Sequence, residues 1–101
     1  MPCGDHLFSG HDDCTVRKWN FSGECLLVMK GHTSFVYCVV LFDAFLFTGS
    51  SDFTVRKWTL DGEPQQVYEG HTASVWFLTV WNNAIFSGGE DTIIQWTGNS
   101  F

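Results

Sequence analysis

Basic residues are scarce in this sequence. Its 101 residues include 5 Lys and Arg against 11 Asp and Glu, which sets the formal net charge at −6. Proteins that bind nucleic acid or an anionic membrane surface need an excess of Lys and Arg on one face. The composition therefore argues against nucleic acid and membrane surfaces as partners.

Long apolar runs are missing as well. No segment approaches the ~20 apolar residues of a membrane span, and the N-terminal stretch MPCGDHLFSG has neither the basic head nor the apolar core of a signal peptide. The four cysteines form no CxxC pair, which favours reduced thiols over a disulfide framework. We expect an intracellular, cytoplasmic protein, and a nuclear location stays open.

Helical periodicity is the third absence. Short runs rich in β-branched and aromatic residues alternate instead with Gly, Asp, Asn and Ser, at the spacing of about 8–12 residues that is typical of an all-β fold. A hydrophobic content of 45%, with 17% aromatic residues, suits one small packed domain. Tight hairpin turns are expected at Gly23 and Gly62. The expected strands are residues 6–9, 15–19, 24–29, 35–41, 44–48, 54–59, 65–69, 75–81, 84–87 and 92–96.

One segment recurs along the chain. The dipeptide Gly31-His32 returns as Gly70-His71, 39 residues later, and Trp19 is followed by Trp58 at the same interval. Independent landmarks therefore share one repeat length of about 40 residues. The copies of the segment are residues 8–19 (FSGHDDCTVRKW), 47–58 (FTGSSDFTVRKW) and 86–96 (FSGGEDTIIQW).

A repeat of about 40 residues with a Gly-His dipeptide, four short strands, a turn Asp and a strand-terminal Trp resembles the WD40 repeat. The resemblance covers essentially the whole chain, although another residue replaces the Asp of the family's Trp-Asp dipeptide in every copy. It implies an all-β fold of β-propeller blades, each a four-stranded antiparallel sheet. The units are a partial blade at residues 1–29, a complete blade at 30–69 and a blade lacking its outer strand at 70–101.

The resemblance also implies a hydrogen-bonded tetrad inside each blade, which links a turn Asp, a His, a Ser or Thr hydroxyl and an indole N–H. Such a network satisfies buried polar groups and fixes the register of the strands. In the third unit one residue is deleted between the Asp and the Trp, which leaves the reach of that indole open. The tetrads are His32, Thr48, Asp52 and Trp58 in the middle unit, and His71, Ser87, Asp91 and Trp96 in the third. The first copy has Ser9, Asp13 and Trp19 without a preceding Gly-His.

Function in such a fold usually lies on the loops and rims of a rigid scaffold. By resemblance, we expect a non-enzymatic scaffold without cofactors that binds a protein or peptide partner at the narrower face of the propeller. Aromatic residues beside acidic ones would favour a partner segment with Lys or Arg, whereas the competing interpretation is that these aromatics fill the core. The expected contact residues are Phe35, Tyr37 and Ser51 in the middle unit, Ser74, Trp76 and Glu90 in the third, and Asp12 in the first.

A hydrolase site and a zinc site are the two alternatives to a structural role for the polar residues of the repeats. Ser87 and His71 could be taken for the nucleophile and base of a hydrolase, but a set that recurs in every unit suits architecture better. A zinc site would need four ligands, and the repeat places two of the candidates at ordinary hairpin positions. The candidate zinc ligands are Cys3, His6, His11 and Cys14.

The expected strands number three, four and three in the successive units, whereas a closed propeller needs about four to eight blades. The chain therefore cannot close by itself, and apolar surface is expected on both flanking sheets. Our first explanation is a segment of a longer propeller, and the alternatives are homo-oligomerisation or blades borrowed from a different partner. Homo-oligomerisation is disfavoured because an end without the outermost strand does not complement a start without the innermost one.

Overall fold

The computed structural model describes residues 6–96, and its strands confirm the all-β prediction. Every expected strand is present, with ends that differ by at most two residues. Within residues 6–96 there is no helix with the length and apolarity needed to traverse a bilayer. The strands are β1 (His6–Gly10), β2 (Thr15–Asn20), β3 (Cys25–Lys30), β4 (Val36–Phe42), β5 (Phe45–Ser50), β6 (Thr54–Trp58), β7 (Pro64–Glu69), β8 (Val75–Trp81), β9 (Ala84–Gly89) and β10 (Ile93–Trp96).

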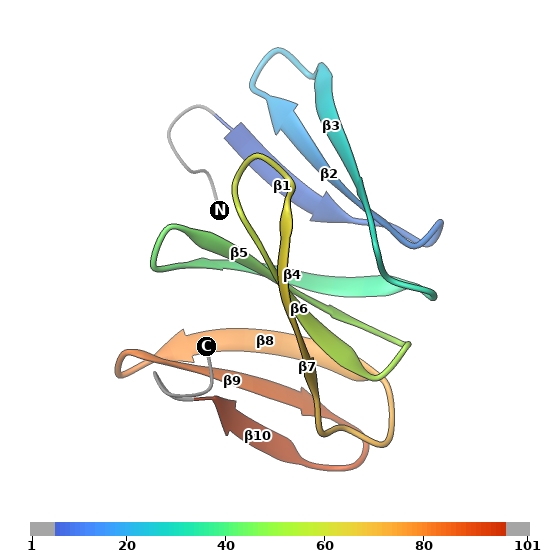
Figure 1. Ribbon diagram of the computed structural model, residues 1–101, viewed down its shortest axis with the longest axis vertical. Helices are drawn as coiled ribbons and strands as arrows, with labels where there is room; N and C mark the ends of the chain where they lie inside the picture. Colours follow the sequence, from blue (N-terminus) through green and yellow to red (C-terminus); the bar gives the residue numbers. More distant parts are fainter. Residues whose placement is uncertain (1–5, 97–101) are drawn as a thin grey trace.

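The strands form three separate antiparallel sheets, and each strand pairs only with its neighbours in sequence. The first sheet has the order β1-β2-β3, the middle sheet β4-β5-β6-β7, and the third sheet β8-β9-β10. Figure 1 shows the sheets following one another along the long axis of the molecule. The arrangement is an open stack with one four-stranded sheet between two three-stranded sheets.

Tight turns with positive φ angles join the strands within each sheet. Gly23 and Gly62 have φ angles of 88° and 89° in the β2–β3 and β6–β7 turns, as expected where a hairpin requires a left-handed residue. The β4–β5 and β8–β9 turns each place two consecutive non-glycine residues at positive φ, the pattern of a type I′ hairpin. These pairs are Asp43 and Ala44, and Asn82 and Asn83.

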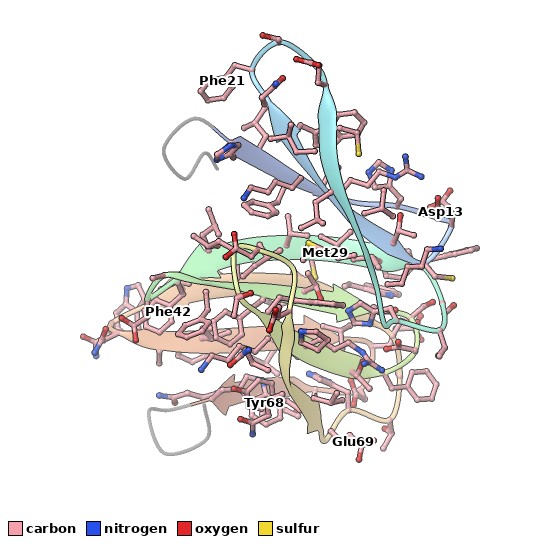
Figure 2. The ribbon with its side chains drawn as sticks, turned by 45° about the horizontal axis from the view of Figure 1, so that its top comes forward. Asp13, Phe21, Met29, Phe42, Tyr68 and Glu69 are labelled. Atoms are coloured by element: carbon pink, nitrogen blue, oxygen red, sulfur yellow. The ribbon has the colours of Figure 1, made fainter. Side chains whose placement is uncertain are left out.

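The apolar core lies between the sheets, in two layers. The first layer joins Phe8, Val16 and Met29 of the first sheet to the face of the middle sheet that carries Leu46 and Trp58. The second layer joins Phe47, Val55 and Tyr68 of the middle sheet to Val75 and Ile85 of the third. Figure 2 shows Met29 and Tyr68 within these layers. The middle sheet is therefore covered on both faces, and each flanking sheet on one.

Lys18 of β2 and Lys57 of β6 hold their ammonium groups against the protein. Lys18 Nζ donates a hydrogen bond of 2.9 Å to the carbonyl oxygen of Leu60, which lies in the β6–β7 turn of the middle sheet. Lys57 Nζ lies 4.1 Å from the centroid of the Phe45 ring, a cation–π geometry. Lys18 thereby adds a polar tie between the first and middle sheets.

Candidate functional site

In the middle sheet, four side chains form one continuous hydrogen-bonded chain. The indole N–H of Trp58 donates to Thr48 Oγ1 over 2.9 Å, and Thr48 Oγ1 lies 2.6 Å from Nε2 of His32. His32 Nδ1 lies 2.9 Å from Asp52 Oδ2. Because a carboxylate only accepts, Nδ1 carries the proton, and Nε2 accepts from the Thr48 hydroxyl. The tetrad expected from the resemblance therefore lies in one buried network.

The electrostatics of this network fix its charge state. Burial raises the pKa of the Asp52 carboxyl, but hydrogen bonds from Thr54, the backbone N–H of Thr33 and His32 outweigh it and bring the pKa to about 2. Burial lowers the pKa of His32, against the opposing effect of the Asp52 hydrogen bond. At neutral pH the pair is therefore a neutral imidazole that donates to an ionised carboxylate.

The third sheet repeats the network with a shorter turn. His71 Nε2 lies 2.7 Å from Ser87 Oγ, and the Trp96 indole donates to the same oxygen over 2.8 Å. Asp91 accepts from His71 Nδ1 at 3.0 Å. The missing residue corresponds to Phe53 of the middle sheet, which sits at a φ of 75° in the β5–β6 turn. The deletion shortens the turn, and the indole still reaches its hydroxyl.

The first sheet completes its network in a different way. The Trp19 indole donates to Ser9 Oγ over 2.8 Å, and the imidazole on that oxygen is His11 from the β1–β2 turn, with Nε2 at 2.6 Å. The rings of His11 and Trp19 are 6.3 Å apart at 49°, nearly the geometry of His32 and Trp58 at 6.3 Å and 52°. Sequence reasoning missed this role. The available signal was a His at the position that Ser50 holds in the middle sheet.

The network of the third sheet leaves Ser87 poorly placed to act as a nucleophile. Ser87 is fully buried, and its oxygen is engaged by both the His71 imidazole and the Trp96 indole. A serine nucleophile has to be reachable by its substrate as well as close to a base. The geometry therefore favours a structural role for this Ser-His-Asp set over the hydrolase alternative.

The four candidate zinc ligands do not form a site in the part of the chain that the structure describes. No group of three or more His, Cys, Asp or Glu side chains suited to a metal occurs among residues 6–96, and Cys3 lies outside them. His11 is bonded to Ser9. Cys14, Cys25 and Cys38 are free thiols, and burial raises the pKa of Cys38 to about 12.

Three aromatic residues expected to contact a partner form a group, which we call the aromatic rim: Phe35, Tyr37 and Trp76. Their exposed fractions are 46%, 48% and 52%. Phe35 and Tyr37 meet edge to face with centroids 6.3 Å apart. Tyr37 from β4 and Trp76 from β8 line an open hollow of about 410 Å³ between the middle and third sheets. The structure thus places these aromatics at the surface and outside the core.

The remaining expected contact residues lie in the loops and turns between strands and are not among the residues that line the hollow. The Ser51 N–H donates to the carbonyl of Phe35 over 2.9 Å, and its hydroxyl bonds to Ser34. Ser74 is half-buried, while Glu90 and Asp12 are exposed. The β1–β2, β5–β6 and β9–β10 turns that carry Asp12, Ser51 and Glu90 lie along one edge of the stack (Figure 1).

Comparison with known proteins places this arrangement among WD40 structures. The family described as "WD domain, G-beta repeat" matches residues 1–20, 23–59 and 62–97. The crystal structure of the computationally designed Ika4 protein is similar with a TM-score of 0.83 and 26% identity, over 96% of this chain. The WD40 β-propeller domain of Doa1 is similar with a TM-score of 0.82 and 28% identity, over 90% of this chain.

A curated relative is the uncharacterized WD repeat-containing protein C126.01c of Schizosaccharomyces pombe. It is 44% identical over 39 residues, which are 38% of this chain and 11% of that protein. The matches to Ika4 and Doa1 cover 62% and 32% of their chains. This chain therefore spans only part of the length of these three proteins, in agreement with an incomplete propeller.

Proposed function

Because the chain belongs to the WD40-repeat family, we propose that it is a non-enzymatic scaffold whose aromatic rim binds an extended segment of a protein partner. The fold is typical of protein-interaction scaffolds, and the hydrogen-bonded networks inside each sheet suit a structural role. Binding surfaces on such scaffolds lie on rims and loops supported by rigid strands. The proposal therefore assigns function to the rim.

The observation that carries the proposal is the hollow between Tyr37 and Trp76. Aromatic side chains that stay half-exposed beside a hollow can bury area on a partner at a low cost in conformational entropy. Ser51 links this surface to the β5–β6 turn, since its N–H donates a hydrogen bond to the carbonyl of Phe35. The rim is thus supported by the β5–β6 turn before any partner arrives.

The partner segment should carry Lys or Arg. The chain has a formal net charge of −6, and Asp12 and Glu90 are exposed on the turns at the same edge. A cation over the face of Tyr37 or Trp76 would gain cation–π attraction, and acidic neighbours would speed its encounter with the rim. Acidic segments should bind more weakly.

Selection from a random peptide library tests this proposal directly. Peptides selected on the wild-type chain should be rich in Lys and Arg and should lose about thirtyfold in affinity on Trp76→Ala, which corresponds to the loss of about 2 kcal/mol that defines a hot spot. Trp81→Ala is the matched control, because Trp81 is 68% exposed and lies at the β8–β9 turn, outside the hollow. Equal binding by Trp76→Ala and the wild type would contradict the proposal.

A further inference from the structure

The first and third sheets each turn one apolar face away from the middle sheet. We call these the Leu7 face, formed by Leu7, Trp19 and Phe21, and the Ile93 face, formed by Phe77, Phe86 and Ile93. Leu7 is 38% exposed and Ile93 is 63% exposed. Figure 2 shows Phe21 at the far end of the first sheet, away from the rest of the molecule. Neither face includes the aromatic rim.

The repeat shows what happens at these positions when another sheet covers them. Leu46 stands 39 residues after Leu7, faces the first sheet and has an exposed fraction of 0%. Val55 is paired with Gly49 as Ile93 is paired with Gly88, so it holds the same place in its sheet. Val55 packs in the layer against the third sheet and is 1% exposed. Both exposed positions are therefore core positions that lack a covering sheet.

The two faces are also complementary to each other. Between the first and middle sheets, the face with Phe8, Val16 and Met29 packs on the face with Leu46. Between the middle and third sheets, the corresponding residues of the next repeat, Phe47, Val55 and Tyr68, pack on the face with Ile85. The chain makes this pairing twice, and the Ile93 and Leu7 faces are the next members of the same two series.

We propose that a second copy of this chain covers these faces, with the Ile93 face of one copy packed on the Leu7 face of the next. The contact would repeat the two inter-sheet contacts already made within the chain. It is heterologous, since the two copies use different surfaces, and it builds a ring or an open chain according to the rotation per copy. The buried apolar area supplies the driving force.

The strands absent from the flanking sheets do not prevent this contact. Sheets that pack face to face need no exchange of strands, and each three-stranded sheet already covers one face of the four-stranded middle sheet. Leu7 lies on β1 and Ile93 on β10, and both strands are present. The absent strands bear on pairing between strand edges at the two ends, whereas the proposed contact is face-to-face packing.

Light scattering on the purified chain tests the proposal. The wild type should show masses that are multiples of 11.4 kDa and that rise over a roughly hundredfold increase in concentration from the micromolar range. Leu7→Glu and Ile93→Glu should each lower the association constant at least tenfold, while circular dichroism shows an unchanged fold because both side chains are exposed. A wild type that stays monomeric at every concentration overturns the proposal.

Val28→Glu is the matched control for Leu7→Glu. Val28 is 40% exposed on the outermost strand of the first sheet, and its repeat counterpart Val67 stays 43% exposed although the first sheet covers that face of the middle sheet. Val28 should therefore stay exposed in the assembly, and its substitution should leave the mass distribution unchanged. If Val28→Glu disrupts assembly as strongly as Leu7→Glu, the proposed register is wrong.

Mixing the two variants distinguishes head-to-tail packing from every symmetric alternative. Leu7→Glu keeps an intact Ile93 face, and Ile93→Glu keeps an intact Leu7 face, while the two acidic faces repel each other. An equimolar mixture should therefore form a dimer of twice the chain mass and nothing larger. Two copies joined through identical surfaces would gain nothing from mixing. A mixture that stays monomeric would overturn the proposal, whatever the fate of the aromatic rim.

Discussion

The β1–β2 and β5–β6 hairpins carry almost the same sequence and satisfy the same polar groups from different sources. In the middle sheet the imidazole on the hydroxyl is His32, which comes from the loop before the innermost strand β4. In the first sheet it is His11, from the turn of the hairpin itself. The indole, hydroxyl and imidazole adopt the same relative arrangement in both. Both networks therefore place an imidazole on the hydroxyl, although the histidine comes from a different segment of the chain in each.

The arginines of the two hairpins show the consequence of that substitution. Arg17 donates to Asp13 Oδ2 over 2.9 Å, whereas the equivalent oxygen of Asp52 is bonded to His32 and to the N–H of Thr33. In residues 6–96, the buried Nε of Arg56 has no hydrogen-bond partner. Two identical Thr-Val-Arg-Lys-Trp segments therefore place the same cation in different surroundings because of a histidine upstream of one of them.

The largest difference between the hairpins should appear on removal of the turn carboxylate. Asp52→Ala leaves the buried His32 imidazole and the Thr33 N–H without their acceptor, which should lower the free energy of unfolding by about 3 kcal/mol. Asp13→Ala should cost less, since its partners are Thr15 and a partly exposed Arg17. Urea denaturation of both variants gives the comparison. Equal losses would show that the middle network contributes no more than the exposed one.

The second-largest effect should come from acid, which lowers the stability contributed by the middle network. Burial lowers the pKa of His32 below its usual 6.5, so the unfolded chain takes up a proton that the folded chain refuses. Stability is then fully present above pH 6.5 and falls as the pH drops below that value. Thermal melting between pH 7 and 5 should show this fall, and His32→Gln should flatten it. A wild-type slope equal to that of His32→Gln would refute the assignment.

The smallest effect should come from the arginines. Arg56→Met removes a buried donor that has no partner, so the free energy of unfolding should be unchanged or rise by about 1 kcal/mol. Arg17→Met breaks the ion pair with Asp13, a partly exposed pair of small worth, and should lower stability slightly. Chemical denaturation should show changes in the free energy of unfolding of opposite sign for the two variants. A clear loss of stability on Arg56→Met would contradict the comparison.

The repeat made most of the architecture predictable from the sequence. Strand alternation located all ten strands, and the recurrence of Gly-His, turn Asp and Trp located the residues of the middle and third networks. These features are local, since they depend on side chains at fixed offsets within one unit. The resemblance also implied partner-contact positions at Phe35, Tyr37 and Trp76, while the sequence alone left open whether these aromatics fill the core.

The features that could not be predicted from the sequence depend on the geometry between repeat units and inside turns. The role of His11 requires a hairpin with Cys14 at a φ of 74°, which no periodicity specifies. The hydrogen bond from Lys18 to Leu60 joins β2 to the β6–β7 turn, 42 residues away in the sequence. The complementarity of the Leu7 and Ile93 faces depends on which side of each sheet is buried at equivalent positions of the repeat.

The pairing of every strand with its sequence neighbours also bears on how the chain folds. Among the strands of residues 6–96, none pairs with a distant part of the chain, since each sheet is a run of consecutive hairpins. Closing such short loops costs little entropy, and folds rich in local pairing form quickly. Each sheet can therefore assemble as it leaves the ribosome, with the preceding sheet already present as a surface on which it condenses.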